Sequence, residues 1–124
     1  MKNSAYEIYE DLATGTIFYF SHSDENFTTG VMAIPPKIEL PKHNRPNAFE
    51  NALQISGRSI IQVFDDDGAI TEHELSAGDT LRMDKGQFHI HANPFDEVSY
   101  SLFKAEGDIS ESMKFIRENY KQII

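Results

Sequence analysis

Apolar and polar side chains alternate in short runs along most of this chain, as they do in β-strands that bury one face. Glycine, proline, asparagine and aspartate separate the runs, because these residues favour turns. The alternating runs predict strands at residues 14–20, 27–34, 37–40, 50–56, 59–64, 69–75, 80–83, 88–92 and 98–103. Short strands at hairpin spacing are typical of an all-β sandwich or barrel. Residues 2–11 fit either an edge strand or a short helical turn.

The C-terminal segment has a different period. Its large side chains recur at helical spacing, at Ile109, Met113, Ile116, Tyr120 and Ile123. The preceding Asp108-Ile-Ser-Glu offers helix-capping residues. We therefore predict one amphipathic helix over about residues 110–122, following a barrel over about residues 14–104. This helix would pack either on its own barrel or on a second subunit.

Length and composition indicate one globular domain of 124 residues, 40% hydrophobic and 25% charged. The chain has no cysteine, which excludes disulfides and thiolate metal ligands. No apolar run approaches the roughly 20 residues that span a bilayer. The first ten residues include acidic side chains and lack the apolar core of a signal peptide. We therefore expect a cytoplasmic protein without membrane contacts.

The net charge of −9 speaks against binding to nucleic acid, since a phosphate backbone requires a cationic face. The 11 lysine and arginine residues are scattered and form no basic stripe. An anionic ligand would therefore have to meet a local cation inside its site. Arg45 is the candidate for that role.

The stretch from Gly78 to Asn93 carries the strongest candidate chemistry. The Asp-Lys-Gly turn at 84–86 separates two expected strands, because Gly86 tolerates the positive φ of a tight turn. Side chains two apart on a strand share a face, so His89 and His91 point the same way. Two imidazoles on one face indicate a ligand site. The alternative for His91 is a hydrogen-bonded place in a wet interior.

The same stretch resembles the second sequence motif of the cupins, Gly-x5-Pro-x-Gly-x2-His-x3-Asn. Gly78, Gly86, His89 and Asn93 match that motif in spacing, and Asp84 stands where the motif has proline. The first cupin motif, His-x-His-x3–4-Glu-x6-Gly, is matched in spacing upstream by three residues. These are His43, Glu50 and Gly57, with Arg45 at the place of the second histidine. Two independent spacing matches cover roughly the middle half of the chain.

The resemblance implies a small single-domain cupin of the RmlC-like type. Its fold would be a double-stranded β-helix, or jelly-roll barrel, with one C-terminal helix. Carried over by position, His43, Glu50 and His89 would be metal ligands. Two imidazoles and a carboxylate suit Fe, Mn or Ni, and Zn is also compatible with them. Cupins commonly pair through their sheets, so the resemblance also implies a homodimer.

Arg45 departs from the implied ligand set, because a guanidinium stays protonated and binds no metal. One interpretation pairs Arg45 with Glu50 and leaves the site free of metal. Another turns Arg45 toward the barrel mouth, where it would grip a carboxylate or phosphate of a substrate. His91 would then supply the missing ligand or relay protons as a catalytic group.

Three classes of function are compatible with the resemblance. One is a metal-dependent oxygenase, isomerase or decarboxylase that acts on a small acid, with Arg45 orienting the anion and His91 moving protons. A second is a metal-free enzyme similar to the sugar epimerases of this fold, with a histidine base and Tyr100 as acid. The third is a binding or sensor module. Gln54 would share the interior face of Glu50 and contact a ligand, or bond to the backbone instead.

Overall fold

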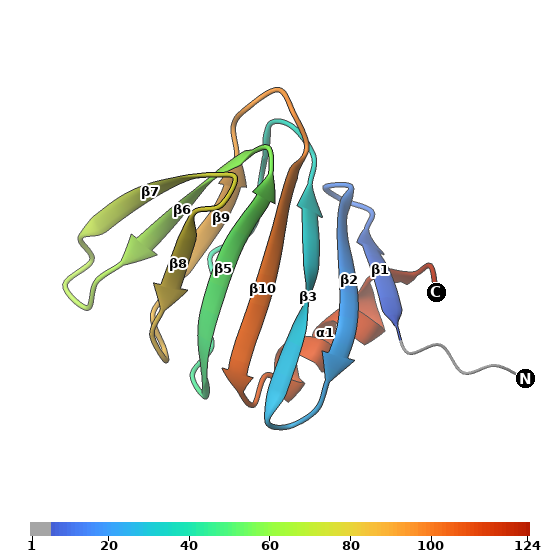
Figure 1. Ribbon diagram of the computed structural model, residues 1–124. Helices are drawn as coiled ribbons and strands as arrows, with labels where there is room; N and C mark the ends of the chain where they lie inside the picture. The colour runs from blue at the N-terminus through green and yellow to red at the C-terminus, as the bar shows by residue number, and fades with distance from the viewer. Residues whose placement is uncertain (1–5) are drawn as a thin grey trace, which may run out of the picture.

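Two antiparallel sheets dominate the computed structural model, which describes residues 6–124 (Figure 1). The larger sheet has the strand order β11-β1-β2-β3-β10-β5-β8, and the smaller has the order β4-β9-β6-β7. The strands are β1 (Glu7–Asp11), β2 (Thr16–Ser23), β3 (Phe27–Ile34), β4 (Ile38–Glu39), β5 (Ala48–Ser56), β6 (Arg58–Phe64), β7 (Ile70–Ser76), β8 (Thr80–Met83), β9 (His89–Asn93), β10 (Ser99–Gly107) and β11 (Lys121–Gln122). The predicted all-β architecture with one helix is confirmed.

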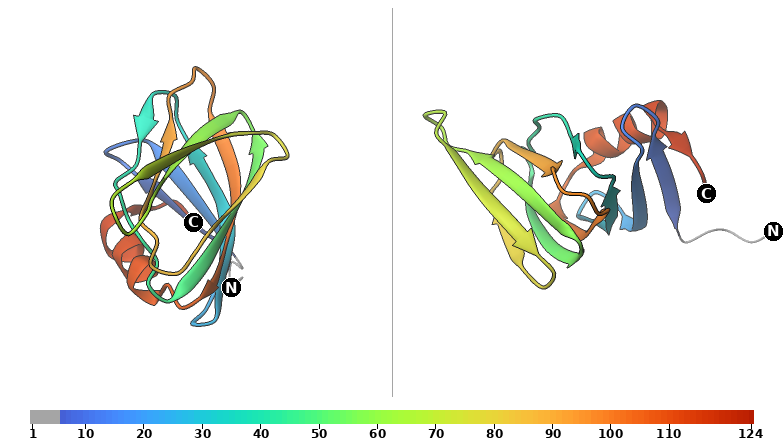
Figure 2. Two further views of the ribbon diagram at one scale, coloured as in Figure 1. Left: turned by 90° about the vertical axis from the view of Figure 1, so that its left-hand side faces the viewer. Right: turned by 90° about the horizontal axis from the view of Figure 1, so that it is seen from above.

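Figure 2 shows the two sheets curving around a common interior. The β6–β7 hairpin stands at one end of the molecule, and β1 with the helix stands at the other. Each strand follows the sequence alternation. On β10, for example, Ser99, Ser101, Phe103 and Ala105 are buried, while the residues between them are exposed. This alternation determines which side chains point into the interior, and therefore which of them can reach the site.

The interior holds two apolar clusters. One lies between the inner face of the larger sheet and the helix, and it includes Phe20, Met32, Phe103 and Met113. The other joins β5 and β8 of the larger sheet to β6 and β7 of the smaller one, through residues such as Ile61. The two clusters leave polar side chains of β5 and β9 in the interior.

Helix α1 (Ser110–Asn119) packs Met113 and Ile116 into the first cluster. The Asp108 carboxylate accepts the backbone N–H of Ser110 at 2.8 Å, which satisfies one free donor of the first turn. The helix is shorter than the predicted 110–122. It ends because Tyr120 is extended, with φ −96° and ψ 157°, and the chain turns back as β11.

The C-terminal strand explains this early end. β11 pairs with β1, and the Ile123 N–H donates to the Ile8 carbonyl at 2.7 Å. The edge of β1 has free backbone groups, and the C-terminal residues satisfy them. Residues 7–11 are thus a strand, which settles the open choice for that part, and residues 2–5 of the same prediction lie outside the described residues. In the described range 6–124, no helix has the length and apolar character needed to cross a bilayer.

Candidate metal centre

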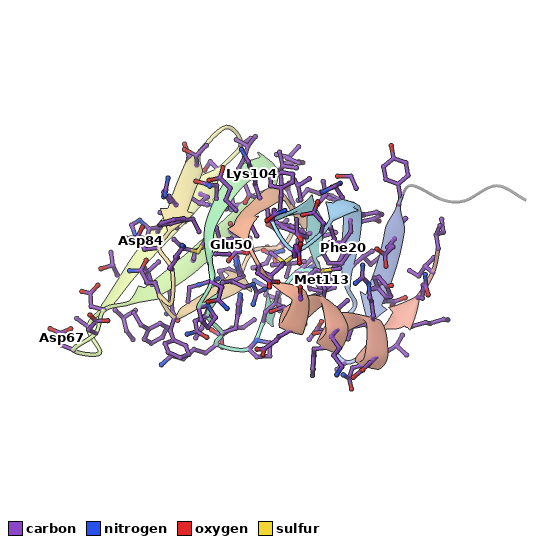
Figure 3. The ribbon with its side chains drawn as sticks, turned by 90° about the horizontal axis from the view of Figure 1, so that it is seen from below. Phe20, Glu50, Asp67, Asp84, Lys104 and Met113 are labelled. Carbon is purple, nitrogen blue, oxygen red and sulfur yellow. The ribbon has the colours of Figure 1, made fainter. Side chains whose placement is uncertain are left out.

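A loop and two strands bring four ligand side chains together in the interior. His43 lies in the loop between β4 and β5, Glu50 lies on β5, and His89 and His91 lie on β9. We call these four residues the His/Glu cluster. Figure 3 labels Glu50 near the middle of the molecule, with Phe20 and Met113 toward the helix.

Strand alternation points the cluster residues inward. Glu50 follows Ala48 and precedes Ala52 on the buried face of β5. His89 and His91 share the buried face of β9, as predicted, and are only 1% and 5% exposed. Neighbouring Ile90 faces the other way and is only half-buried. Asn93 ends the inward row and anchors β9, since its amide donates to the carbonyls of Ile34 and Glu97 at 2.9 and 2.7 Å.

The rings of His43 and His89 are oriented by backbone carbonyls. Nδ1 of His43 lies 3.1 Å from the carbonyl oxygen of Pro41, and Nδ1 of His89 lies 3.1 Å from that of Gln87. A proton on Nδ1 completes both hydrogen bonds. It leaves the Nε2 lone pair of each ring directed into the cluster, which is how metal-binding histidines are commonly held.

The ligand atoms of the cluster converge, and they lie within 4.8 Å of one another. His43 Nε2, Glu50 Oε2 and His89 Nε2 are buried and make no hydrogen bond in the structure. Nε2 of His89 lies 2.9 Å from Oε2 of Glu50, but the two atoms are not aligned as donor and acceptor. Buried polar atoms are rarely left without a partner. Such an arrangement fits donors that share a cation between them.

Burial and neighbouring charges set the protonation of these groups. Burial, and after it the nearby Arg45 charge, lower the pKa of His43 to about 4. Burial also lowers the pKa of His91 to about 3, against the opposing effect of Glu50. For Glu50, burial raises the pKa, but the His89 contact and the Arg45 charge outweigh it and hold the pKa well below its usual range. Neutral imidazoles beside an ionised carboxylate are the forms that bind metal.

The cluster therefore fits a first-row divalent metal. Its donors are three imidazole nitrogens and one carboxylate, a set that suits Mn, Fe, Ni, Cu or Zn better than Mg or Ca. His91 occupies the space near the other three donors and supplies the fourth. The first motif has Arg45 where a histidine is expected, and the fourth donor of the cluster is a histidine from another strand. Its visible signal in the sequence is the His-x-His spacing of 89 and 91.

Arg45 lines the cavity beside the cluster and makes no ion pair with Glu50. Its Nε is buried without a hydrogen-bond partner, and its other contact is a long one of 3.5 Å from Nη1 to the Asn44 carbonyl oxygen. The structure therefore does not contain the Arg45–Glu50 pair that would replace a metal. It matches the interpretation in which Arg45 turns toward the cavity.

A cavity of about 520 Å³ opens next to the cluster. His43, Glu50 and His91 form one end of it, with Arg45 beside them. The inner face of the larger sheet, helix α1, the loop after β4 and Phe88 form the remaining walls, with residues that include Phe18, Phe20, Met32, Phe103, Ile109, Ser112 and Ile116. The sequence predicted the amphipathic helix, but its spacing did not reveal that the helix encloses this cavity. Only the folded chain brings residues near 110 next to His43.

Two residues expected in the substrate site lie elsewhere. Gln54 is fully buried, but its amide is occupied, because it donates to Ser56 O and Ser99 Oγ and accepts from Ser59 Oγ at 2.8–3.0 Å. Of the two alternatives for Gln54, the structure therefore has the one in which its side chain bonds within the protein and does not face a ligand. Tyr100 is 39% exposed on the outer face of β10, since the inward positions of that strand are Ser99 and Ser101. The structure thus places Tyr100 away from the His/Glu cluster.

Solved structures show what this fold is similar to. KdgF from Halomonas sp. has 10% sequence identity and a TM-score of 0.70, over 84% of this chain and 91% of that one. A deletion mutant of Bacillus subtilis oxalate decarboxylase OxdC has 23% identity and a TM-score of 0.68, over 75% of this chain and 26% of that one. Oxalate oxidase in complex with glycolate has 16% identity and a TM-score of 0.63, over 66% of this chain and 42% of that one.

These likenesses concern structure alone. No protein-family model matches the sequence, and no curated protein sequence matches it. The chain spans about a quarter of the oxalate decarboxylase chain and about two fifths of the oxalate oxidase chain. It spans most of the KdgF chain.

Proposed function

The chain has the cupin fold, and we propose that it is a metal-dependent enzyme that acts on a small anionic metabolite. The metal is a divalent first-row ion held by the His/Glu cluster. The observation that carries this proposal is the convergence of buried donor atoms, three of which have no hydrogen-bond partner. Four such donors within 4.8 Å are costly to bury unless they share a cation.

Each residue of the cluster has a part in this proposal. His43, Glu50 and His89 are the ligands that the two sequence motifs place, and His91 is the fourth. When bound, the metal supplies a Lewis acid or a redox centre next to the cavity. Arg45 binds the anionic group of the substrate and orients it toward the cluster, because its guanidinium lies in the cavity wall without a carboxylate partner.

The reaction is proposed only at the level of class. The solved structures of similar fold include an oxalate oxidase and an oxalate decarboxylase, which act on a small acid. We propose chemistry of the oxygenase, isomerase or decarboxylase type for this chain. The site excludes bulk water from the donor atoms, since His89 and His91 are almost fully buried. Such exclusion strengthens the electrostatic interaction of an anion with Arg45.

The experiment that tests this proposal is elemental analysis of untagged protein purified without chelator. We expect close to one first-row metal ion per chain. Glu50→Gln keeps the shape of the side chain but removes the anionic donor, so it is expected to lose the metal. Glu39→Gln, at an exposed position of β4, is the matched control and is expected to keep it. Wild-type protein that stays free of metal after reconstitution with Mn, Fe, Ni and Zn would contradict the proposal.

The alternative is a binding module that holds a small ligand without turning it over, and the cavity beside Arg45 supports it equally. A bound ligand stabilises the native state by mass action in both cases. Product formation that stops on chelation identifies the enzyme. Ligand-induced stabilisation that survives chelation, without product, identifies the binding module. The epimerase-like alternative needs a catalytic acid, and Tyr100, the residue expected in that role, lies on the outer face.

The homodimer and the cytoplasmic location remain predictions. The face of the larger sheet that points away from the interior is a suitable dimer surface. Tyr19, Val31, Leu102 and Leu53 lie side by side there across β2, β3, β10 and β5.

A further inference from the structure

The geometry of the cavity points to an amphipathic monocarboxylate as the ligand, one with a single acidic head and a hydrocarbon or aromatic body. The carboxylate lies at Arg45 beside the His/Glu cluster, and the body lies between the larger sheet and helix α1. This inference rests on the proposed function, because it names the substrate class of the same site. It differs from that proposal in assigning the apolar part of the cavity to the ligand.

The size of the cavity is the first observation. A volume of about 520 Å³ is in the range that holds a drug-sized molecule. A two-carbon acid would occupy only the end next to the cluster. The remaining space lies mostly against apolar side chains and would have to hold water with few hydrogen-bond partners, which is unfavourable.

The chemistry of the far wall is the second observation. Phe20, Met32 and Phe103 reach it from the inner face of the larger sheet, and Ile109 and Ile116 reach it from the helix end. Figure 3 shows Phe20 and Met113 between the sheet and the helix. These side chains offer no polar atom to a ligand except the thioether sulfur of methionine. They therefore favour a hydrocarbon or aromatic body.

The free cation is the third observation. Two cationic residues line the cavity, Lys42 and Arg45. The Lys42 ammonium lies 4.0 Å from the centre of the Phe64 ring and is held there by a cation–π contact. The Arg45 Nε, in contrast, is buried without a partner. Arg45 is thus the group that requires an anion.

Glu111 limits the number of acidic groups. It lies in the cavity wall on the first turn of α1, at a solvent-exposed position. A second carboxylate on the ligand would meet both its charge and the apolar wall. The ligand is therefore a monoacid, which distinguishes it from short dicarboxylates.

Calorimetric titration with straight-chain acids tests the inference. The probes are butanoate, hexanoate and octanoate, with oxalate and 1-octanol as comparisons. We expect affinity to rise about fourfold for each added methylene, the gain from burying hydrocarbon, and to level off once the cavity is filled. Oxalate is expected to bind more weakly than octanoate. Affinity that does not change with chain length would overturn the inference.

Two variants distinguish the contribution of the ligand's carboxylate head to its affinity from that of its apolar body. Arg45→Gln is expected to weaken octanoate by about 10- to 100-fold, the loss of a charge-assisted hydrogen-bonded pair, and to leave 1-octanol unchanged. Ser112→Trp narrows the cavity from the half-buried side of α1. It is expected to weaken octanoate while leaving butanoate unchanged. Equal effects of Arg45→Gln on the acid and the alcohol would overturn the assignment of the head.

Metal content measured in the same samples distinguishes this inference from the proposed function. Protein that holds stoichiometric metal but shows no dependence on chain length contradicts the inference and supports the metal centre. Graded binding of acids by protein that takes up no metal supports the inference and contradicts the metal centre.

Discussion

His43 and His89 exchange both of their backbone hydrogen bonds. The His43 N–H donates to the His89 carbonyl at 3.0 Å, and the His89 N–H donates to the His43 carbonyl at 2.9 Å. This isolated antiparallel bridge ties a loop residue to strand β9, and the two ring centres lie 4.2 Å apart. A loop side chain is normally less well fixed than one on a strand. Here the bridge fixes the place of one ligand against another before any metal binds.

We predict that His91 is a metal ligand, although the first motif would place the remaining histidine ligand at position 45. His91→Ala removes one of four converging donors, and we expect metal affinity to fall at least about 10-fold, as it does when even supporting residues are lost. His73→Ala, a half-buried histidine on β7 outside the cluster, is the control. Titration with a competing chelator measures both. Unchanged metal affinity with slowed turnover would instead identify His91 as a proton relay.

Arg45→Gln is expected to change two affinities in opposite directions. The Arg45 charge acts on the cluster, since it helps to lower the pKa of Glu50 and of both His43 and His91. The same charge repels a dication, so its removal should tighten metal binding, by up to about tenfold. It should also weaken carboxylate ligands. Metal titration and calorimetry on one preparation check both effects, and a loss of both affinities would show that Arg45 instead supports the structure.

The sequence singled out the three cluster residues that lie at fixed motif spacing, but it left the role of His91 open. His43, Glu50 and His89 follow from two local patterns. His91 enters the cluster only because β9 lies opposite the His43 loop, a relationship of distant segments. The expected place of Tyr100 in the site differs from the structure for a simpler reason. A period of two fixes which residues share a face, but it does not say which face is inside.

The helix shows the same limit. Its period predicted the buried Met113 and Ile116 correctly, because the period of an amphipathic helix depends on local spacing alone. Its end was predicted three residues too late. The reason is that Lys121 and Gln122 pair with the edge of β1 as a strand, so the helix cannot continue through them. Competition between a helix and a distant sheet edge cannot be derived from the period of either.

Gln54→Leu should destabilise the protein without affecting its site. The variant leaves the buried hydroxyls of Ser59 and Ser99 without their partner, and it also removes the donor to the carbonyl of the exposed Ser56. Buried groups left unpaired cost about 1–3 kcal/mol of unfolding free energy. Metal and ligand binding should remain at wild-type levels. Urea unfolding measures the loss, and Gln62→Leu, whose amide bonds to the exposed Glu72, is the control.

A lower affinity for metal in folded Gln54→Leu protein would contradict this separation. It would mean that the hydrogen bonds of Gln54 also position Glu50, four residues away on the same face of β5.

The predicted homodimer is tested on the outer face of the larger sheet. Leu102 is 38% exposed there and lies beside Val31 and Leu53 on the neighbouring strands. Leu102→Lys places a charge in the middle of this apolar row, where a partner sheet would have to desolvate it. We expect light scattering to report a dimer for wild type and a monomer for the variant. Glu72→Lys on the smaller sheet is the control, and a monomeric wild type would contradict the dimer.

An ion pair between Arg117 and Glu7 ties the C-terminal helix to β1, and this link responds to pH. Arg117 donates to both carboxylate oxygens of Glu7 at 2.9 and 2.8 Å. The Arg117 hydrogen bonds hold the pKa of Glu7 below its ordinary value of 4.5. A depressed folded pKa means that the pair stabilises the protein above pH 4.5, and that this stabilisation is lost as the pH falls through the folded pKa.

Glu7→Gln should therefore be less stable than wild type at pH 7, by about 0.5–1 kcal/mol, since the pair is partly exposed and screened by solvent. The difference should shrink steadily below pH 4.5, as Glu7 takes up a proton in the wild type too. Urea unfolding at a series of pH values measures it, with Glu118→Gln on the exposed side of α1 as the control. A difference that stays constant down to pH 3 would show that the variant acts through packing and not through the charge of Glu7.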